Sequence, residues 1–170
     1  MVQTLRAALL CFALTACQKL TVVAPPTPVV QTPDIAVTPP KPAQIDLVSA
    51  PATGPVAAYV QAEAVRAQAD GRRLLVYVGA TWCEPCQRFH TAAKAGALDD
   101  EFANLRLLEF DLDRDADRLA ADGYHSQLIP LLALPGPDGK GNGRGMQGSI
   151  KGEGAVAQMR PRLREVLNAP

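Results

Sequence analysis

The sequence predicts an α/β domain in which helices cover both faces of a central mixed β-sheet. Two observations lead to this prediction. Runs of strand-forming residues alternate along the chain with segments whose apolar residues recur at helical spacing. The first of these runs, residues 74–78, is apolar throughout, which is typical of a strand buried on both faces. Such an alternation of helices and strands favours a sheet with helices on each side.

The first half of the domain contains the pattern helix, strand, helix. Residues 56–69 are expected to form a helix, because small and apolar residues recur on one face and Asp70-Gly71 can end it. The strand at residues 74–78 follows. It leads into Cys83-Glu84-Pro85-Cys86 and then into sequence that permits a helix as far as residue 98.

The second half contains three further strands and two helices. A strand at residues 105–112 and a short helix at 115–122 come first. The next strand, 128–134, contains Ile129-Pro130, and a Gly/Pro-rich turn joins it to 144–150, which is expected to pair with it antiparallel. The last helix is expected at 153–167. Pro161 should kink it or start a new turn, since proline has no N–H to donate.

The composition excludes some classes of protein. A chain of 170 residues is long enough for one domain with a substantial core. It carries 17 basic and 17 acidic side chains and no cluster of Lys or Arg. It therefore lacks the positive field on which nucleic-acid binders depend, and no nucleic-acid partner is expected. Four cysteines are too few for a disulfide-rich scaffold, which leaves processing, metal or redox chemistry to explain them.

Residues 1–16 have the layout of a secretory signal, with one cation, an apolar run and then small residues. The run Leu14-Thr15-Ala16-Cys17 resembles the bacterial lipoprotein lipobox. That resemblance implies removal of residues 1–16, lipidation of Cys17 and anchoring in the cell envelope through the acyl chains. Gln18 resembles the residue after the cysteine in lipoproteins sorted to the outer membrane, so its periplasmic face is expected in a bacterium with two membranes. The alternative is a secreted protein with an unmodified Cys17.

Residues 17–55 are expected to form a lipidated, Pro-rich and disordered tether. Nine of the 15 prolines lie between Pro25 and Pro55, in a stretch with only three charged residues. The globular domain is therefore expected to span residues 56–170.

The chemistry of the chain is concentrated in Cys83-Glu84-Pro85-Cys86, where a buried strand passes into a helix. A CxxC pair in this context is typical of a redox motif. The unpaired amides and the dipole at a helix N-terminus favour thiolate over thiol at Cys83. Cys86, nearly one turn further on, is expected to point inward and to reach the same sulfur. Cys83 would then attack a substrate disulfide, and Cys86 would resolve the mixed disulfide.

These residues resemble the thioredoxin family, from Arg72 to Leu167. The resemblance rests on Trp82 and the CxxC pair, on Ile129-Pro130 at the position of the family's cis-proline, and on Gly148 in the last strand. It implies a thioredoxin-like three-layer sandwich and a Cys83–Cys86 disulfide in the oxidised protein. It further implies that Trp82 and Pro130 support the site and that the backbone of Ile129 pairs with a substrate peptide.

The sequence departs from the family at two positions. Tyr77 replaces the family's buried acid, six residues before the first cysteine, and Glu109 replaces a lysine on the neighbouring strand. Glu109 is therefore a candidate base for proton transfer, with a solvated carboxylate at a strand end as the alternative. Tyr77 is expected in the core. Glu84 places a carboxylate inside the motif, which should oppose the Cys83 thiolate and lower the reduction potential.

The sequence thus predicts an extracytoplasmic thiol-disulfide oxidoreductase that reduces or isomerises protein disulfides and receives electrons from an upstream thiol-disulfide donor. It predicts no cofactor and no resident metal. Two alternatives stay open: a metallochaperone that holds Cu(I) between Cys83 and Cys86, and a tethered binding module whose CxxC is a stable disulfide. A zinc site would need His90 and His125 to converge on both cysteines, and these histidines are expected to lie on the surface or in helix packing.

Overall fold

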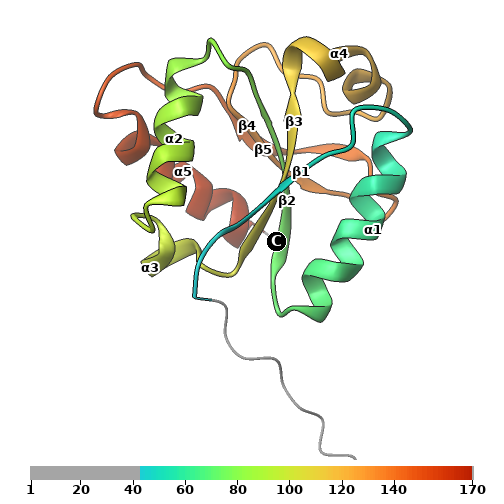
Figure 1. The fold of residues 1–170 in the computed structure, drawn as a ribbon, viewed down its shortest axis with the longest axis horizontal. Coiled ribbons are helices and arrows are strands. Elements are labelled where there is room, and N and C mark those ends of the chain that lie inside the picture. Colours follow the sequence, from blue (N-terminus) through green and yellow to red (C-terminus); the bar gives the residue numbers. More distant parts are fainter. Residues whose placement is uncertain (1–42, 170) are drawn as a thin grey trace, which may run out of the picture. The chain divides into compact units, whose positions relative to one another are not determined.

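The computed structural model describes residues 43–169, in which helices alternate with strands (Figure 1). In chain order the elements are β1 (Asp46–Ser49), α1 (Val56–Ala69), β2 (Arg73–Gly79), α2 (Glu84–Lys94), α3 (Asp99–Phe102), β3 (Leu105–Asp111), α4 (Leu112–Ala121), β4 (Leu131–Pro135), β5 (Gly141–Gln147) and α5 (Ala155–Asn168). The strands form a five-stranded sheet in the order β1-β3-β2-β4-β5. β1, β3 and β2 are parallel, β4 is antiparallel to β2, and β5 is antiparallel to β4.

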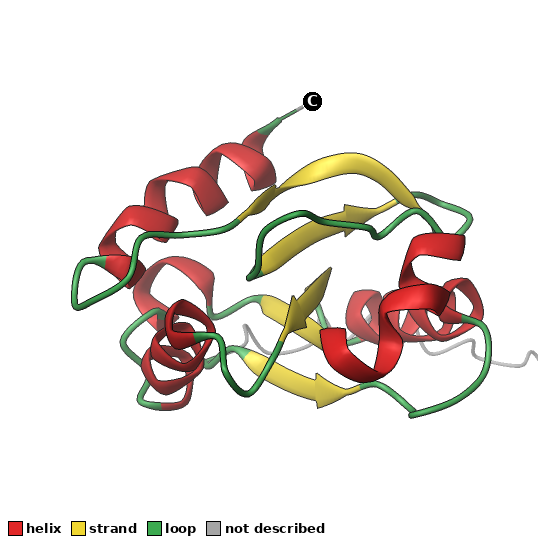
Figure 2. Cartoon of the chain, turned by 90° about the horizontal axis from the view of Figure 1, so that it is seen from above, coloured by secondary structure: helices red, strands yellow, loops and turns green. Residues whose placement is uncertain are grey.

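Two hydrophobic cores lie on the two faces of this sheet. Successive side chains of β2 point to opposite faces, as in any strand. Leu75 and Tyr77 therefore pack with α2, α3 and α5, whereas Val76 and Val78 pack with α1 and α4. Figures 1 and 2 show these two groups of helices on opposite sides of the sheet. Every residue of β2 except Arg73 is buried, so the α/β arrangement predicted from the sequence is confirmed.

The folded region extends further toward the N-terminus than the sequence predicts. β1 lies within the stretch 17–55 that is expected to be a disordered tether, and it pairs in parallel with β3 at the edge of the sheet. The flanking residues Ile45 and Ala50 are buried, and Asp46 accepts a hydrogen bond from Arg106 at 2.6 Å. The folded part therefore begins upstream of residue 56, because partners distant in sequence stabilise a strand that is too short to show a pattern of its own.

Several other boundaries differ from the prediction for local reasons. The helix after the CxxC motif ends at Lys94, where Gly96 takes a φ of 74°, and a separate short helix α3 follows. β4 begins only after Pro130, which has no N–H to contribute to a ladder. β5 begins at Gly141, three residues before the predicted start. α5 continues through Pro161 and does not restart there.

The predicted signal segment, Cys17 and the tether up to residue 42 lie outside the described residues. Between residues 43 and 169, none of the helices is both long enough and apolar enough to cross a membrane.

Candidate active site

The CxxC motif lies between the end of β2 and the first turn of α2. Cys83 is the N-cap residue of α2, and Pro85 occupies the first turn, where its missing N–H costs no helical hydrogen bond. Cys83 and Cys86 form a disulfide, with an S–S distance of 2.04 Å and a Cα–Cα distance of 5.2 Å. The backbone N–H of Cys86 donates to the Cys83 Sγ over 3.2 Å. The structure thus places the amide end of a helix against Cys83, as the sequence predicts.

The two cysteines have different surroundings. Their exposed fractions are almost equal, 4% for Cys83 and 3% for Cys86, so exposure does not separate their roles. Cys83 receives the amide N–H of the helix, an interaction that stabilises a thiolate. Cys86 lines a pocket between α2 and the sheet. These surroundings favour Cys83 as the attacking sulfur, which stays a prediction.

Trp82 links the segment before Cys83 to helix α4 through a hydrogen bond. Its side chain is 64% exposed, yet its indole Nε1–H donates to Asp113 Oδ2 over 2.9 Å. Asp113 lies in the first turn of α4, which packs on the opposite face of the sheet from α2. The hydrogen bond therefore connects the loop that carries Cys83 to a second helix.

The peptide bond between Ile129 and Pro130 is cis. Pro130 is buried, and its carbonyl oxygen accepts from the N–H of Gly148 over 2.9 Å. Ile129 is half-buried and packs against the core cluster that contains both cysteines. Gly148 has a φ of 68°, and a Cβ there would lie 2.9 Å from the Cβ of Leu128. A larger residue at position 148 would thus be strained by its backbone and crowded by Leu128.

Two apolar side chains that the sequence analysis did not single out are exposed. Leu128 is 61% exposed and Ile150 is 53% exposed. Leu128 lies two residues before Pro130, and Ile150 lies in the loop between β5 and α5. Hydropathy alone could not distinguish them from core residues, because both stand in segments predicted as strand.

Glu84 is turned toward the loop before α5. Its carboxylate accepts from the N–H of Gly152, with distances of 3.1 and 3.2 Å to the two oxygens, and forms an ion pair with Arg88 one turn along α2. The hydrogen bond from Arg88 and that from Gly152 hold the pKa of Glu84 below its usual value. Its negative charge is therefore partly compensated, which weakens its opposition to a thiolate at Cys83.

Tyr77 and Glu109 lie opposite each other in the register of β2 and β3. Tyr77 is 3% exposed and stacks on Phe89, with ring centroids 5.9 Å apart, so it lies in the core as expected. The Glu109 side chain is only 16% exposed and lies 2.5 Å, from Oε1 to Nε2, from His90 of α2. Glu109 is thus an enclosed carboxylate paired with a histidine.

The two histidines occupy unrelated positions. His125 is exposed in the loop after α4, whereas His90 contacts Glu109. Among the described residues, no group of three or more His, Cys, Asp or Glu side chains could hold a metal ion. The sequence analysis did not predict that His90 contacts Glu109. The available signal was the position of His90 four residues after Cys86, because that spacing places the two side chains on one face of a helix.

The strand order, the CxxC pair at the start of α2 and the cis-proline before β4 define a thioredoxin-like fold. No protein-family model matches the chain, and no curated protein matches it.

The solved structures similar to this chain include several thioredoxins. A poplar thioredoxin h is 19% identical, with a TM-score of 0.44 over 75% of this chain and 99% of that one. A thioredoxin from Trichomonas vaginalis is 20% identical, with a TM-score of 0.43 over 70% and 96% of the two chains. Thioredoxin O1 from Arabidopsis thaliana in its oxidised state is 13% identical, with a TM-score of 0.39 over 72% and 96%.

Proposed function

We propose that the protein is a thiol-disulfide oxidoreductase whose redox pair is Cys83 and Cys86. The observation that carries the proposal is the disulfide between these residues at the N-terminus of α2. A thiolate at Cys83 would accept the Cys86 N–H and lie at the positive end of the helix dipole, and both interactions favour the reduced, nucleophilic form. The cis-Ile129-Pro130 bond and the half-buried Ile129 provide a backbone segment for an extended substrate peptide.

Each cycle reduces one disulfide of the substrate and forms one disulfide between Cys83 and Cys86. The Cys83 thiolate attacks a protein disulfide, forming a mixed disulfide and releasing one substrate sulfur as a thiolate. Cys86 then loses a proton and attacks the Cys83 sulfur, which releases the second substrate sulfur and closes the Cys83–Cys86 disulfide. Two electrons pass to the substrate. An upstream thiol-disulfide donor must return them for a further cycle.

The proposal is tested by the reduction of insulin by the protein with dithiothreitol as the donor. We expect catalytic turnover of the insulin disulfides. The same preparation, fully reduced, is titrated with Cu(I) against a chelator of known affinity. Absence of turnover together with tight Cu(I) binding would support the metallochaperone alternative, and absence of both would support the binding-module alternative.

We further propose that the protein acts as a reductant or isomerase and not as a primary oxidant, because Glu84, the residue directly after Cys83, adds a negative charge to the motif. The Glu84→Gln variant should have a higher reduction potential than the wild type, since removal of this charge favours the thiolate. The rise should be smaller than about 30 mV, because Arg88 and the Gly152 N–H already compensate the carboxylate. Equilibration with glutathione buffers measures the potential.

Glu165→Gln is the matched control for this measurement, because Glu165 is an exposed acid on α5 and makes no ion pair among the described residues. Its potential should equal that of the wild type. A wild-type potential near −120 mV, at the strongly oxidising end of the scale, would contradict the reductant role. An unchanged potential in Glu84→Gln would contradict the assigned effect of the charge.

We also propose that the domain is tethered to a membrane outside the cytoplasm through lipidated Cys17. The support is the sequence Leu14-Thr15-Ala16-Cys17 and the Pro-rich stretch that follows it. In a bacterium with two membranes, Gln18 favours the periplasmic face of the outer membrane. The full chain expressed in such a host should incorporate labelled palmitate, and Cys17→Ser should not. Equal labelling of both chains would refute lipidation at this residue.

A further inference from the structure

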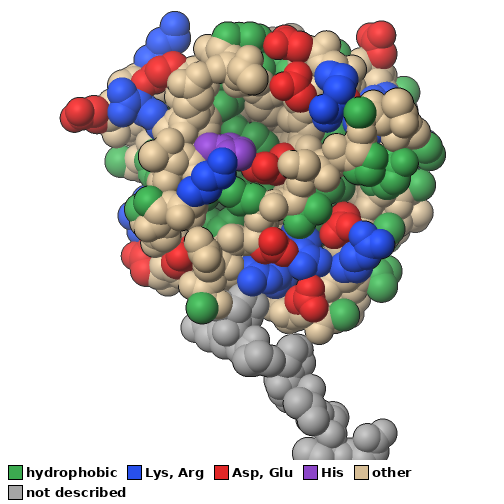
Figure 3. Space-filling view, viewed as in Figure 1, with side chains coloured by type: hydrophobic (Ala, Val, Ile, Leu, Met, Phe, Trp, Pro, Cys, Tyr) green, Lys and Arg blue, Asp and Glu red, His purple; other side chains and the backbone are tan. Residues whose placement is uncertain are grey.

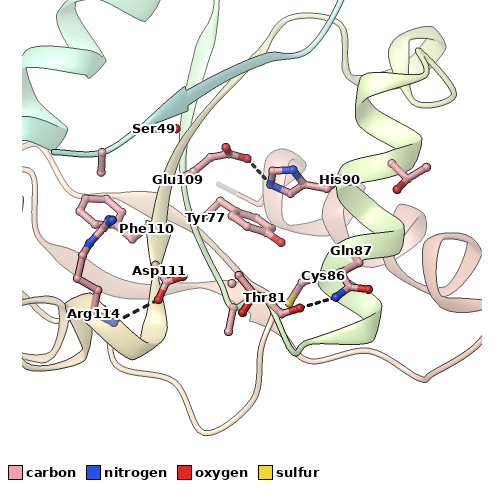
Figure 4. A pocket seen from close by; sticks show the side chains of 14 residues that line it. Ser49, Tyr77, Thr81, Cys86, Gln87, His90, Glu109, Phe110, Asp111 and Arg114 are labelled. Carbon is pink, nitrogen blue, oxygen red and sulfur yellow. Dashed lines mark hydrogen bonds and ion pairs between the residues drawn. The ribbon is translucent and has the colours of Figure 1, made fainter. Parts of the chain in front are cut away.

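A pocket of about 460 Å³ lies behind the disulfide, on the side where α2 faces β3 and β1. Cys86 is part of its wall, together with Tyr77 from β2, Glu109 from β3 and His90 from α2. Figure 4 shows the side chains of these residues gathered around one space. Figure 3 shows a hollow on this face, with a histidine against an acidic side chain at its rim. The pocket thus places Cys86 beside titratable groups.

One buried oxygen atom in this pocket lacks a hydrogen-bond partner. Within residues 43–169, the Tyr77 Oη has no hydrogen bond, whereas the Glu109 Oε1 has its ion-pair contact with the Nε2 of His90. A buried hydroxyl of this kind is normally satisfied by ordered water or by a bound group. Burial, and secondarily the negative charge of Glu109, raise the pKa of Tyr77 well above its usual range. Tyr77 therefore stays a neutral hydroxyl that can donate into the pocket.

The pair of Glu109 and His90 has a defined geometry. The Nε2 of His90 lies 2.5 Å from the Oε1 of Glu109, so the two side chains form an ion pair when the imidazole is protonated. The ring of His90 also lies against that of Tyr77, with centroids 5.3 Å apart. His90 lies four residues after Cys86 on α2, so the helix that carries the second cysteine also carries the partner of Glu109.

Other charged groups that line the pocket have partners elsewhere. Asp111 caps α4 and accepts from the backbone N–H groups of Asp113 and Arg114 at 2.9 and 3.2 Å. The guanidinium of Arg114 is paired with Asp115. β1 and the residue that follows it contribute only the uncharged Ser49 and Ala50. Glu109, which is paired with the imidazole of His90, is thus the carboxylate in this wall that does not cap a helix and is available to take a proton.

We propose, on the basis of the oxidoreductase function above, that Glu109 accepts the proton of Cys86 during resolution and that His90 is its positioning residue. The S–H proton of Cys86 passes to the Glu109 carboxylate through water or the Tyr77 hydroxyl in the pocket. The resulting Cys86 thiolate attacks Cys83 Sγ, the bond between Cys83 and the substrate sulfur breaks, and the substrate leaves as a thiolate. His90, whose Nε2 lies 2.5 Å from the Glu109 Oε1, holds the carboxylate in the pocket that Cys86 lines.

The two attacks can be followed separately with 5,5′-dithiobis(2-nitrobenzoate) in a stopped-flow instrument. The reagent is used at concentrations high enough that the first attack is not limiting. Attack by Cys83 releases one thionitrobenzoate, and resolution by Cys86 releases the second. Near pH 7, well below the ordinary pKa of a thiol at about 8.5, Glu109→Gln should slow the second phase at least about tenfold, because Cys86 loses its base. The first phase should keep its rate.

The rate of the second phase tests His90, whose side chain is 27% exposed and should tolerate substitution. In His90→Gln the second phase should slow while the first phase keeps its rate. The double variant His90→Gln/Glu109→Gln should be no slower in the second phase than Glu109→Gln alone, because His90 acts through Glu109. A residue that acts only through packing would change the stability of the protein and would not show this dependence on Glu109. Glu165→Gln serves again as the control and should match the wild type in both phases.

The outcomes separate the two proposals. A normal first phase with an unchanged second phase, in Glu109→Gln or in His90→Gln, overturns the proton-transfer role and leaves the redox pair intact. A wild type that releases no thionitrobenzoate from Cys83 overturns the proposed function itself. If Glu109→Gln does not fold, the rates of the two phases in His90→Gln decide the matter alone.

Discussion

Cys83→Ser is expected to lower insulin reduction by about 10³-fold or more, to the uncatalysed background. The serine hydroxyl is a far poorer nucleophile than a thiolate, and it cannot form the mixed disulfide through which the electrons pass. Cys86 cannot replace Cys83, because it lies inside α2 and lacks the capping N–H that Cys83 receives. Turnover of the purified variant with dithiothreitol as donor measures the effect.

Cys86→Ser is the matched control, since it also removes one sulfur from the same motif. It should retain the first attack and stop at a covalent adduct, so that the protein migrates with its substrate on a non-reducing gel. Cys83→Ser should form no adduct. Substantial turnover by Cys83→Ser, or adducts formed equally by both variants, would contradict the assignment of Cys83 as the attacking residue.

Asp115→Asn is expected to destabilise the domain by about 3 kcal/mol. Asp115 is fully buried, and its carboxylate accepts hydrogen bonds from Arg114, Arg118 and the backbone N–H of Asp111. The amide has the same shape but leaves the two guanidinium groups without their counter-charge. Urea unfolding near pH 7 measures the loss. Asp117→Asn on the exposed side of α4 is the control, and it should change the stability by less than about 0.5 kcal/mol.

The stability difference should also depend on pH. Burial alone would raise the pKa of Asp115, but the hydrogen bonds from Arg114, Arg118 and Asp111 outweigh it and hold that pKa below its usual value. A carboxyl group with a lowered pKa in the folded state contributes stability above the pKa of the unfolded chain, about 3.9, and loses it as the pH falls further. The gap between wild type and Asp115→Asn should therefore narrow below about pH 4. A constant gap would indicate that the charge of Asp115 contributes nothing.

Local patterns in the sequence were enough to predict the central part of the fold. The apolar run at 74–78 is a doubly covered strand, and the CxxC pair lies at its exit into a helix. Strand periodicity even determines that Tyr77 faces the same core as Leu75. These features depend on neighbours in the chain, which is why a single sequence reveals them.

The sequence did not predict features that depend on contacts between residues far apart in the chain. β1 has four residues, and its pairing with β3 joins positions about 60 residues apart. Likewise, the contact of His90 with Glu109 depends on how α2 lies across the sheet. The carboxylate could be singled out as a candidate from its place on a strand, but its partner could be identified only once the helix was positioned.

The edge strand β1 has a mechanical consequence. It is the first described element, so a pull from the N-terminal side of the chain enters the domain through β1, whose four residues pair only with β3. β2, which leads to the CxxC pair, and β4, which follows the cis-proline, lie deeper in the sheet. Under tension β1 should detach before they separate. Ser49 and Ala50 would leave with it, which would widen the pocket beside Glu109 while the redox pair stays in place.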